Sequence, residues 1–267
     1  MSTETPSSSS KRQKTSKDNE TSPPYELIYW PSIPGRGEHI RLVLEDAGVL
    51  YTDTAHAKDG MKSVTAQISP SNLGDSLNPP PLAPPILKHG DLTISQTSNI
   101  LLYLGPRLGL MPEGDGMFRV NALVLTALDG LSNEAHDCHH PVSTSSYYED
   151  QLEESKRKSK DYRENRLPKF LGYFERVLRG EASAGGEWLH GGKCSVADIC
   201  LFHCLDGVKF AFPRAMGRLE KEGKYKGVFE LYGRVKGRER IKAYLESERR
   251  QEFSLGIYRH YPELDEE

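Results

Sequence analysis

The sequence has few cysteines, no long apolar run and no large excess of charge of either sign. It contains 4 cysteines in 267 residues and carries a formal net charge of -3. Four scattered cysteines do not make a disulfide framework, and no Cys-x-x-Cys pair stands near the first expected strand. These absences argue against a disulfide-stabilised domain and a dithiol redox enzyme. The charge balance gives no indication of a nucleic-acid partner.

The N-terminus lacks the apolar segment of a secretory signal, and no apolar run approaches the roughly 18–20 residues of a membrane span. We therefore expect a soluble cytoplasmic protein that makes no membrane contact. Residues 1–23 lack aromatic and branched aliphatic side chains, so they are predicted to form a disordered tail. The basic cluster Lys11 to Lys14 has the composition of a weak nuclear signal; ordinary solvated charge is the alternative.

Regular patterning begins at Tyr25. The run Tyr25–Trp30 is rich in residues that favour strands, and the apolar positions of 38–47 fit one face of a helix. A second strand is expected over 50–54, and a strand–helix–strand unit makes the two strands parallel. The polar stretch that follows contains at most a short helix around 64–68.

The stretch 83–105 combines several local signals. Pro84 and Pro85 precede two short runs, 86–88 and 92–94, that are joined by a Gly-containing turn and predict a hairpin. A hydroxyl-rich helix start at 95–98 follows. Such a corner can pair with an extended peptide and hold a carboxylate at the helix N-terminus. An ordinary hairpin–helix corner is the alternative.

Beyond residue 116 the pattern is helical throughout. Ser195 and Asp198 form a capping-box variant before an apolar helix, and Pro168 is expected to kink a long charged helix. The predicted helices cover residues 117–135, 147–178, 196–210, 226–234 and 238–247.

The corner at 83–105 resembles the glutathione site of the cytosolic glutathione transferases, because the prolines, the Gly90-Asp91-Leu92-Thr93 turn and the pair Gln96-Thr97 occur in order. The first strand and helix resemble the tyrosine-type members (Sigma, Mu and Pi), and residues 133–142 look most like fungal ones. The resemblance implies an α/β N-terminal thioredoxin-like domain followed by an all-α C-terminal helical domain. The expected divisions are 1–23 (tail), 24–108 (thioredoxin-like), 109–116 (linker), 117–250 (helical) and 251–267 (C-terminal tail).

The resemblance also assigns roles to residues. Tyr29 matches the catalytic tyrosine, whose O–H would stabilise the glutathione thiolate; Ser32 is a rival, and a half-buried strand tyrosine is the plain alternative. The binding residues that the family pattern implies are Trp30, Arg36, Pro84, Pro85 (the cis proline), Gln96 and Thr97, with Lys62 or Lys58 for the glycyl carboxylate, and Asn133 (Glu134 next to it) where the family has an acidic residue from the partner subunit.

The implied function is conjugation of glutathione, a co-substrate, to small hydrophobic electrophiles, or glutathione-dependent peroxide reduction. No further cofactor is expected. The electrophile pocket would be walled by Trp30, Pro31, Ile33, His139, His140 and Phe212. A non-catalytic ligand-binding or regulatory protein is the alternative.

The resemblance also implies a homodimer. Residues 72–84 lack the aromatic residue that forms the dimer key in the Mu and Pi classes, and Leu73, Leu77 and Leu82 are the candidate substitutes. We expect no metal: Cys138-His139-His140 lacks a second ligand pair at a convincing spacing, and buried thiols are the default.

Overall fold

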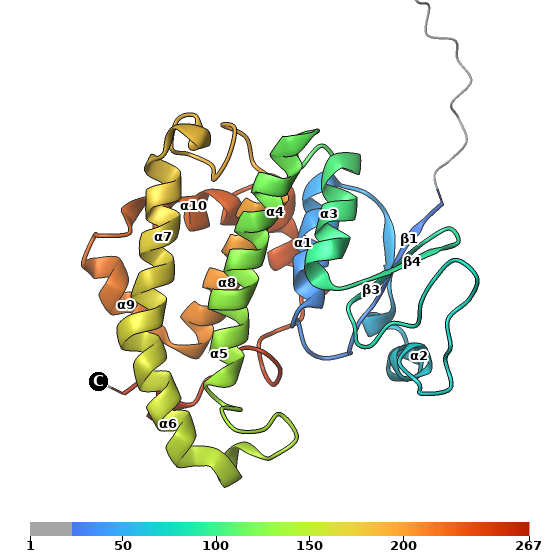
Figure 1. Ribbon diagram of the computed structural model, residues 1–267, viewed down its shortest axis with the longest axis horizontal. Coiled ribbons are helices and arrows are strands. Elements are labelled where there is room, and N and C mark those ends of the chain that lie inside the picture. The colour runs from blue at the N-terminus through green and yellow to red at the C-terminus, as the bar shows by residue number, and fades with distance from the viewer. Residues whose placement is uncertain (1–22, 267) are drawn as a thin grey trace, which may run out of the picture.

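The computed structural model describes residues 23–266. The predicted N-terminal tail, except Pro23, and the basic cluster at Lys11 to Lys14 lie outside that range. Figure 1 shows two parts: a small sheet with helices α1, α2 and α3, and a larger group of helices beside it. Helices α1 and α3 lie between the sheet and the helical part, whereas α2 lies at the opposite side of the sheet.

The sheet has four strands in the order β2-β1-β3-β4. They are β1 (Tyr25–Ile28), β2 (Tyr51–Asp53), β3 (Ile86–His89) and β4 (Leu92–Ser95). Strand β1 runs parallel to β2 and antiparallel to β3, and β3 and β4 form a hairpin. The predicted strand–helix–strand unit and the predicted hairpin are therefore confirmed, with strand ends within two residues of those expected.

Three helices accompany the sheet. Helix α1 (Gly37–Ala47) ends at Gly48, which adopts a left-handed conformation with φ 68°. Helix α2 (Gly60–Gln67) begins four residues earlier than expected, and α3 (Thr97–Arg107) follows the hairpin. Because Leu42, Val43 and Leu44 of α1 are fully buried, this helix serves the cores of both parts.

The helical part begins with α4 (Asp115–Ala127), which continues through a π-helical turn (Leu128–Asn133) into α5 (Glu134–Asp137). Helix α6 (Leu152–Asp161) passes through a second π-helical turn (Tyr162–Arg166) into α7 (Leu167–Arg179). Pro168 stands in the first turn of α7, directly after the second π-helical turn. The sequence pattern predicted both long helices but gave no sign of the π turns.

Helix α8 (Val196–Ala211) is the buried centre of the helical part, and the predicted capping box is confirmed: Ser195 and Asp198 bond to each other's backbone. Helices α10 (Lys226–Lys236) and α11 (Glu239–Leu245) were expected, but α9 (Pro213–Lys221) was not. The apolar and polar runs of the sequence around α9 are too short to predict a helix. Hydrogen bonds to a distant segment of the chain hold this helix instead. The Asp265 carboxylate accepts from the backbone N–H groups of Arg214 and Ala215 in its first turn.

The C-terminal segment, residues 251–266, packs against the helical part instead of projecting from it. Ile257, Tyr258 and Leu264 are buried, and Tyr261 stacks on Tyr148 with ring centroids 3.9 Å apart. No helix among residues 23–266 combines the length and apolar character needed to cross a bilayer.

Buried charges join the two parts. Arg41 of α1 is fully buried and pairs with Asp53 at 2.6 Å and with Glu38 at 3.2 Å. Glu38 also accepts a bond from the Tyr244 hydroxyl and pairs with Arg250. Since a buried charge without its partner is costly, this network holds α1 against α11 in a defined position.

Candidate functional site

A cavity of about 370 Å³ lies where the hairpin, the start of α3, the loop before α1 and helix α4 meet. It brings together most of the predicted binding residues, which are far apart in the sequence. The residues that line it are Arg36, Ala83, Pro84, Pro85, Gln96, Thr97, Ser98, Leu125, Leu128, Asp129 and Asn133.

One wall is the hairpin edge. The peptide bond between Pro84 and Pro85 is cis, as expected from the family pattern, and β3 starts at the next residue. Pro84 and Pro85 have no N–H and cannot donate to a bound strand, but the carbonyl groups of Ala83, Pro84 and Pro85 remain acceptors. An extended peptide bound here would donate its own N–H to such a carbonyl.

The N-terminus of α3 lines the cavity at a position suited to a negatively charged group. Gln96 precedes the helix with φ 73°, a conformation that non-glycine residues rarely adopt and that is concentrated at functional sites. Thr97 is 4% exposed, and its hydroxyl oxygen has no hydrogen-bond partner among the described residues. A helix N-terminus with a buried, unpartnered hydroxyl favours binding of a carboxylate.

Across the cavity, a chain of polar side chains runs from the π-helical turn that follows α4 to the loop before α1. The Asp129 carboxylate accepts from the Asn133 amide at 3.5 Å, and the Asn133 oxygen accepts from the Arg36 guanidinium at 2.7 Å. Glu134, the neighbour of Asn133, points elsewhere and pairs with Arg166 at 2.6 Å. The acidic group that lines the cavity is therefore Asp129. Sequence reasoning missed it, although its place four residues before Asn133 puts both on one helix face.

Tyr29 is bonded to Arg36 and is not itself among the residues that line the cavity. Its hydroxyl oxygen accepts a 2.8 Å hydrogen bond from the Arg36 backbone N–H and a further bond from that of Gly37. Within residues 23–266 no acceptor takes the hydroxyl proton itself. Burial raises the pKa of Tyr29, and the Arg36 N–H offsets this in part. The side chain is thus a neutral O–H donor at pH 7.

Two glycines allow this position of Tyr29. A Cβ atom at Gly35 would overlap its hydroxyl, and one at Gly37 would overlap its ring. The loop is held from both sides, because Arg41 donates to the Pro34 carbonyl at 3.2 Å and the His203 ring donates to the Gly35 carbonyl at 3.1 Å. The carbonyl can only accept, so His203 Nε2 carries the proton. The turn that follows Tyr29 is therefore fixed by both parts of the chain.

Other predicted residues lie outside the cavity. Trp30 packs against the small cluster of Ile28, Val64 and Ile86 at the α2 side of the sheet. Lys62 and Lys58 are exposed, and neither lines the cavity. Ser32, the rival of Tyr29, is exposed with φ 64°.

The C-terminal segment occupies the region expected for an electrophile pocket. Ser254 donates to the Ser32 carbonyl at 3.3 Å, and Gly256 lies against Ile33. His139 is buried beneath Ile257, whose carbonyl is 3.0 Å from its Nε2. Phe212 is a core residue that packs on Tyr162 and forms no wall. The segment 254–258 thus covers the expected pocket, which the sequence pattern did not foresee.

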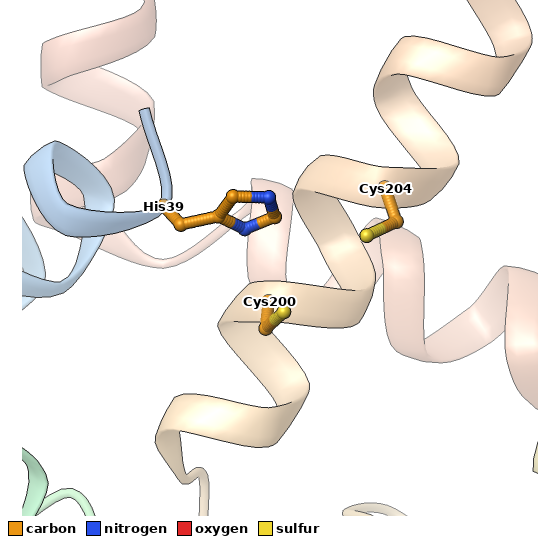
Figure 2. A group of neighbouring side chains, drawn as sticks. All are labelled: His39, Cys200 and Cys204. Carbon is orange, nitrogen blue, oxygen red and sulfur yellow. The ribbon is translucent and has the colours of Figure 1, made fainter. Parts of the chain in front are cut away.

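Two groups of side chains have the composition of metal sites. One consists of His39 from α1 and Cys200 and Cys204 from α8, and Figure 2 shows the ring and the two sulfurs turned toward one another. Burial raises the pKa of the Cys200 thiol and lowers that of His39 to about 3. Both ring nitrogens of His39 lack a hydrogen-bond partner among the described residues, so this group lacks the outer bond that orients a ligating histidine. The other group is His136, His139 and His140.

Comparison with known proteins gives a consistent result. A family model described as "Glutathione S-transferase, C-terminal domain" matches residues 136–248. A glutathione S-transferase of Dirofilaria immitis is 29% identical over 193 residues, which are 72% of this chain and 80% of that protein. "Glutathione S-transferase P 1" of Xenopus laevis is 28% identical over 184 residues, 68% of this chain and 76% of the relative.

The solved structure of a Pi-class glutathione S-transferase from Onchocerca volvulus superimposes with a TM-score of 0.62 at 26% identity, covering 83% of this chain and 92% of that one. The glutathione transferase fold expected from the sequence is therefore confirmed. The relatives named here are nematode and vertebrate proteins, so they give no support to the expected likeness to fungal members. In fold, in the family model that matches its C-terminal part and in its relatives, this chain is similar to the cytosolic glutathione transferases, Pi-class proteins among them.

Proposed function

We propose that the chain is a glutathione transferase whose glutathione site is the cavity between the hairpin, α3 and α4. The observation that carries the proposal is that Thr97, whose buried hydroxyl has no partner among the described residues, stands at the N-terminus of α3 and lines the same cavity as Pro84 and Pro85. In this proposal the γ-glutamyl carboxylate binds at the start of α3, and the cysteinyl backbone lies along the hairpin edge. The protein acts in the cytoplasm, with glutathione as its co-substrate.

The charges of the cavity suit the zwitterionic end of glutathione. A γ-glutamyl group carries one carboxylate and one ammonium group, and the cavity offers a helix N-terminus and the Asp129 carboxylate for them. Arg36, opposite, adds a positive charge for a second carboxylate. We therefore assign the ammonium contact to Asp129, the contact with the γ-glutamyl carboxylate to Gln96 and Thr97, and the contact with a second carboxylate to Arg36, which Asn133 holds by accepting its hydrogen bond.

Tyr29 stabilises the thiolate in this proposal. A free thiol has a pKa of about 8.5, so only a small fraction is ionised at neutral pH. The phenol oxygen already accepts from two backbone N–H groups at the start of α1, and its proton is left to donate to sulfur. Donation from a neutral phenol favours the anion and lowers the thiol pKa. The tyrosine hydroxyl thus acts as a donor to the charge and not as a base.

The electrophile approaches the thiolate from the side covered by residues 254–258. Conjugation requires that this segment, tied to the loop by the Ser254–Ser32 hydrogen bond, makes room for the second substrate. Peroxide reduction needs less space and would use the same thiolate. Because residues 254–258 cover this side, a second candidate is a transferase-like protein that binds glutathione without turnover.

The proposed enzyme is a homodimer. Leu73, Leu77 and Leu82 are 85%, 70% and 86% exposed in the chain, and α4 presents Phe118 and Leu125 at its surface. Exposed apolar side chains gathered on the two elements expected at a subunit contact favour burial against a second copy. Because residues 72–84 contain no aromatic residue, we expect these leucines to make the contact between the subunits.

Turnover of a chlorodinitrobenzene-type substrate tests the function. The full chain at neutral pH should form the thioether in proportion to enzyme and glutathione concentration. Glutathione binding by calorimetry with no turnover on a panel of electrophiles or hydroperoxides would favour the non-catalytic candidate. Loss of both would contradict the site itself.

A further inference from the structure

Three histidines form a cluster at the end of α5. His136 lies in α5, and His139 and His140 follow three and four residues later, on the same face. One ring nitrogen from each lies within 4.8 Å of the others, and the ring centroids are 4.8–5.2 Å apart. Cys138, next to His139 in the sequence, turns into the core and donates its S–H to the Glu134 carbonyl. The group that the structure assembles is therefore three imidazoles without a thiol.

His139 is oriented in the way that metal ligands usually are. Its Nε2 bonds the Ile257 carbonyl at 3.0 Å, and because a carbonyl only accepts, Nε2 carries the proton. The lone pair is then on Nδ1, which is buried and has no partner among residues 23–266. A ligating histidine typically donates its other ring N–H to a backbone carbonyl or a carboxylate, which fixes the ring and its tautomer.

His140 also bonds the backbone of Ser143 and Ser146, but a neutral imidazole keeps one acceptor nitrogen, so both His136 and His140 can present a lone pair. The Gln151 amide nitrogen, 3.4 Å from His140 Nδ1, has only two protons and lies closer to three carbonyls, at 2.9–3.3 Å. It therefore does not need the histidine. The side chain of His136 is 24% exposed, with the Asp137 carboxylate 3.9 Å from its Nδ1. Both rings are reached from solvent, so an ion can enter and leave.

The charged groups near the cluster affect how an ion could be held. The charged groups facing the cluster are Arg36, Arg259 and Asp137. Two guanidinium groups disfavour a cation held by charge alone, so binding would depend on coordination by nitrogen.

We propose that His136, His139 and His140 form a binding site for one divalent transition-metal ion that prefers imidazole nitrogen: Zn²⁺, Cu²⁺ or Ni²⁺. Three ligands leave at least one coordination position open to water or a small ligand. The site is distinct from the proposed glutathione cavity, and the inference does not depend on transferase activity. Because His139 bonds the Ile257 carbonyl, the ion would also strengthen the attachment of the C-terminal segment.

Calorimetric titration of the full, tag-free chain tests the proposal. Zn²⁺, Cu²⁺ and Ni²⁺ are added to protein freed of metal by chelator, with Mg²⁺ as the hard-cation control. We expect one ion per chain with micromolar or tighter affinity for the transition metals, no Mg²⁺ binding, and nitrogen hyperfine structure in the Cu²⁺ electron paramagnetic resonance spectrum. A double variant, H136N with H140N, should bind at least about 10-fold more weakly, whereas H190N, a partly exposed histidine elsewhere, should bind like the wild type.

The variants replace partly exposed rings, and circular dichroism checks their folding. Zn²⁺ should raise the Tm of the wild type and leave that of the double variant unchanged. Absence of one-to-one micromolar binding by the wild-type chain would overturn the proposal without any variant. Equal affinity of the wild type and a folded double variant would overturn it as well.

Discussion

The backbone N–H of Arg36 donates a 2.8 Å hydrogen bond to the hydroxyl oxygen of Tyr29. One residue thereby contributes twice: its backbone fixes the phenol, while its side chain lines the cavity and binds Asn133. The proposed thiolate donor and the proposed glutathione cavity are thus two sides of one short turn. Any shift of this turn would move both together.

Replacing Tyr29 with phenylalanine should separate binding from chemistry. The ring remains packed on Gly35 and Gly37, but the donor to sulfur is lost. We expect glutathione affinity to be retained, kcat/KM to fall about 10- to 1000-fold and its pH midpoint to rise. Steady-state kinetics across pH measure all three. Tyr25→Phe, at the other end of β1, is the matched control and should behave as wild type. Unchanged kinetics in Tyr29→Phe would promote Ser32.

Thr97→Val keeps the shape of the side chain and removes the hydroxyl. A hydrogen bond to a charged group contributes about 1.5–3 kcal/mol, so the Kd for glutathione should rise about 10- to 100-fold. The free energy of unfolding should not fall, because the hydroxyl is buried without a partner. Calorimetry and urea denaturation test the two halves. Thr65→Val on α2, where the hydroxyl bonds only local carbonyls, is the control. Equal Kd values for Thr97→Val and wild type would contradict the carboxylate assignment.

Acid should destabilise the chain through His39. Its pKa is about 3 in the folded chain, against about 6.5 when unfolded, so between these values the unfolded chain binds more protons. Stability is then fully present above about pH 6.5 and falls by up to about 1.4 kcal/mol per pH unit below it. Burial is the main cause; the groups that face the ring are Arg36, His203, Cys200 and Cys204.

Urea denaturation from pH 7 to pH 4.5 measures that slope. The slope should be shallower in His39→Leu by about 1.4 kcal/mol per pH unit, whatever its stability at pH 7. Leu201→Ala, equally buried and without a titrating group, should be less stable at every pH and keep the wild-type slope. The same slope in His39→Leu and wild type would show that the ring is not the titrating group.

A homodimer should form through the leucines of the loop before β3. Light scattering at micromolar concentration should give twice the 30.0 kDa chain mass, with dissociation favoured by high salt if charged pairs assist the contact. Leu77→Ser combined with Leu82→Ser should weaken association, whereas Leu255→Ser, similarly exposed, should not. A monomer mass for the wild type at low and high salt would refute the dimer.

The parts of the fold that the sequence predicted are those with strong local signals. Strands β1, β3 and β4 have β-rich runs bounded by proline and glycine, and Ser195 with Asp198 marks the start of α8. The π turns and α9 escaped because they depend on contacts between distant segments, such as the Asp265 carboxylate at the start of α9. No local pattern contains that information.

In the candidate site, too, local motifs predicted some residues, whereas others are placed there only by tertiary packing. Arg36, Gln96 and Thr97 were named from motifs, and the structure places all three on one cavity. Asp129 and the segment 254–258 could not be found by motif, because their positions follow from how α4 and the C-terminal residues pack. His136 could have been found, because it stands three and four residues before His139 and His140, a spacing that puts side chains on one helix face. From the sequence we grouped only the consecutive residues Cys138, His139 and His140 and therefore left it out.

The central claim is that the cavity binds glutathione and that the chain holds its sulfur as a thiolate. The pH titration of bound glutathione, followed by thiolate absorbance in the ultraviolet, tests it most directly. We predict an apparent thiol pKa about two units below the free value of about 8.5, and a pKa nearer the free value in Tyr29→Phe. Bound glutathione that titrates like the free thiol in the wild-type chain would contradict the account.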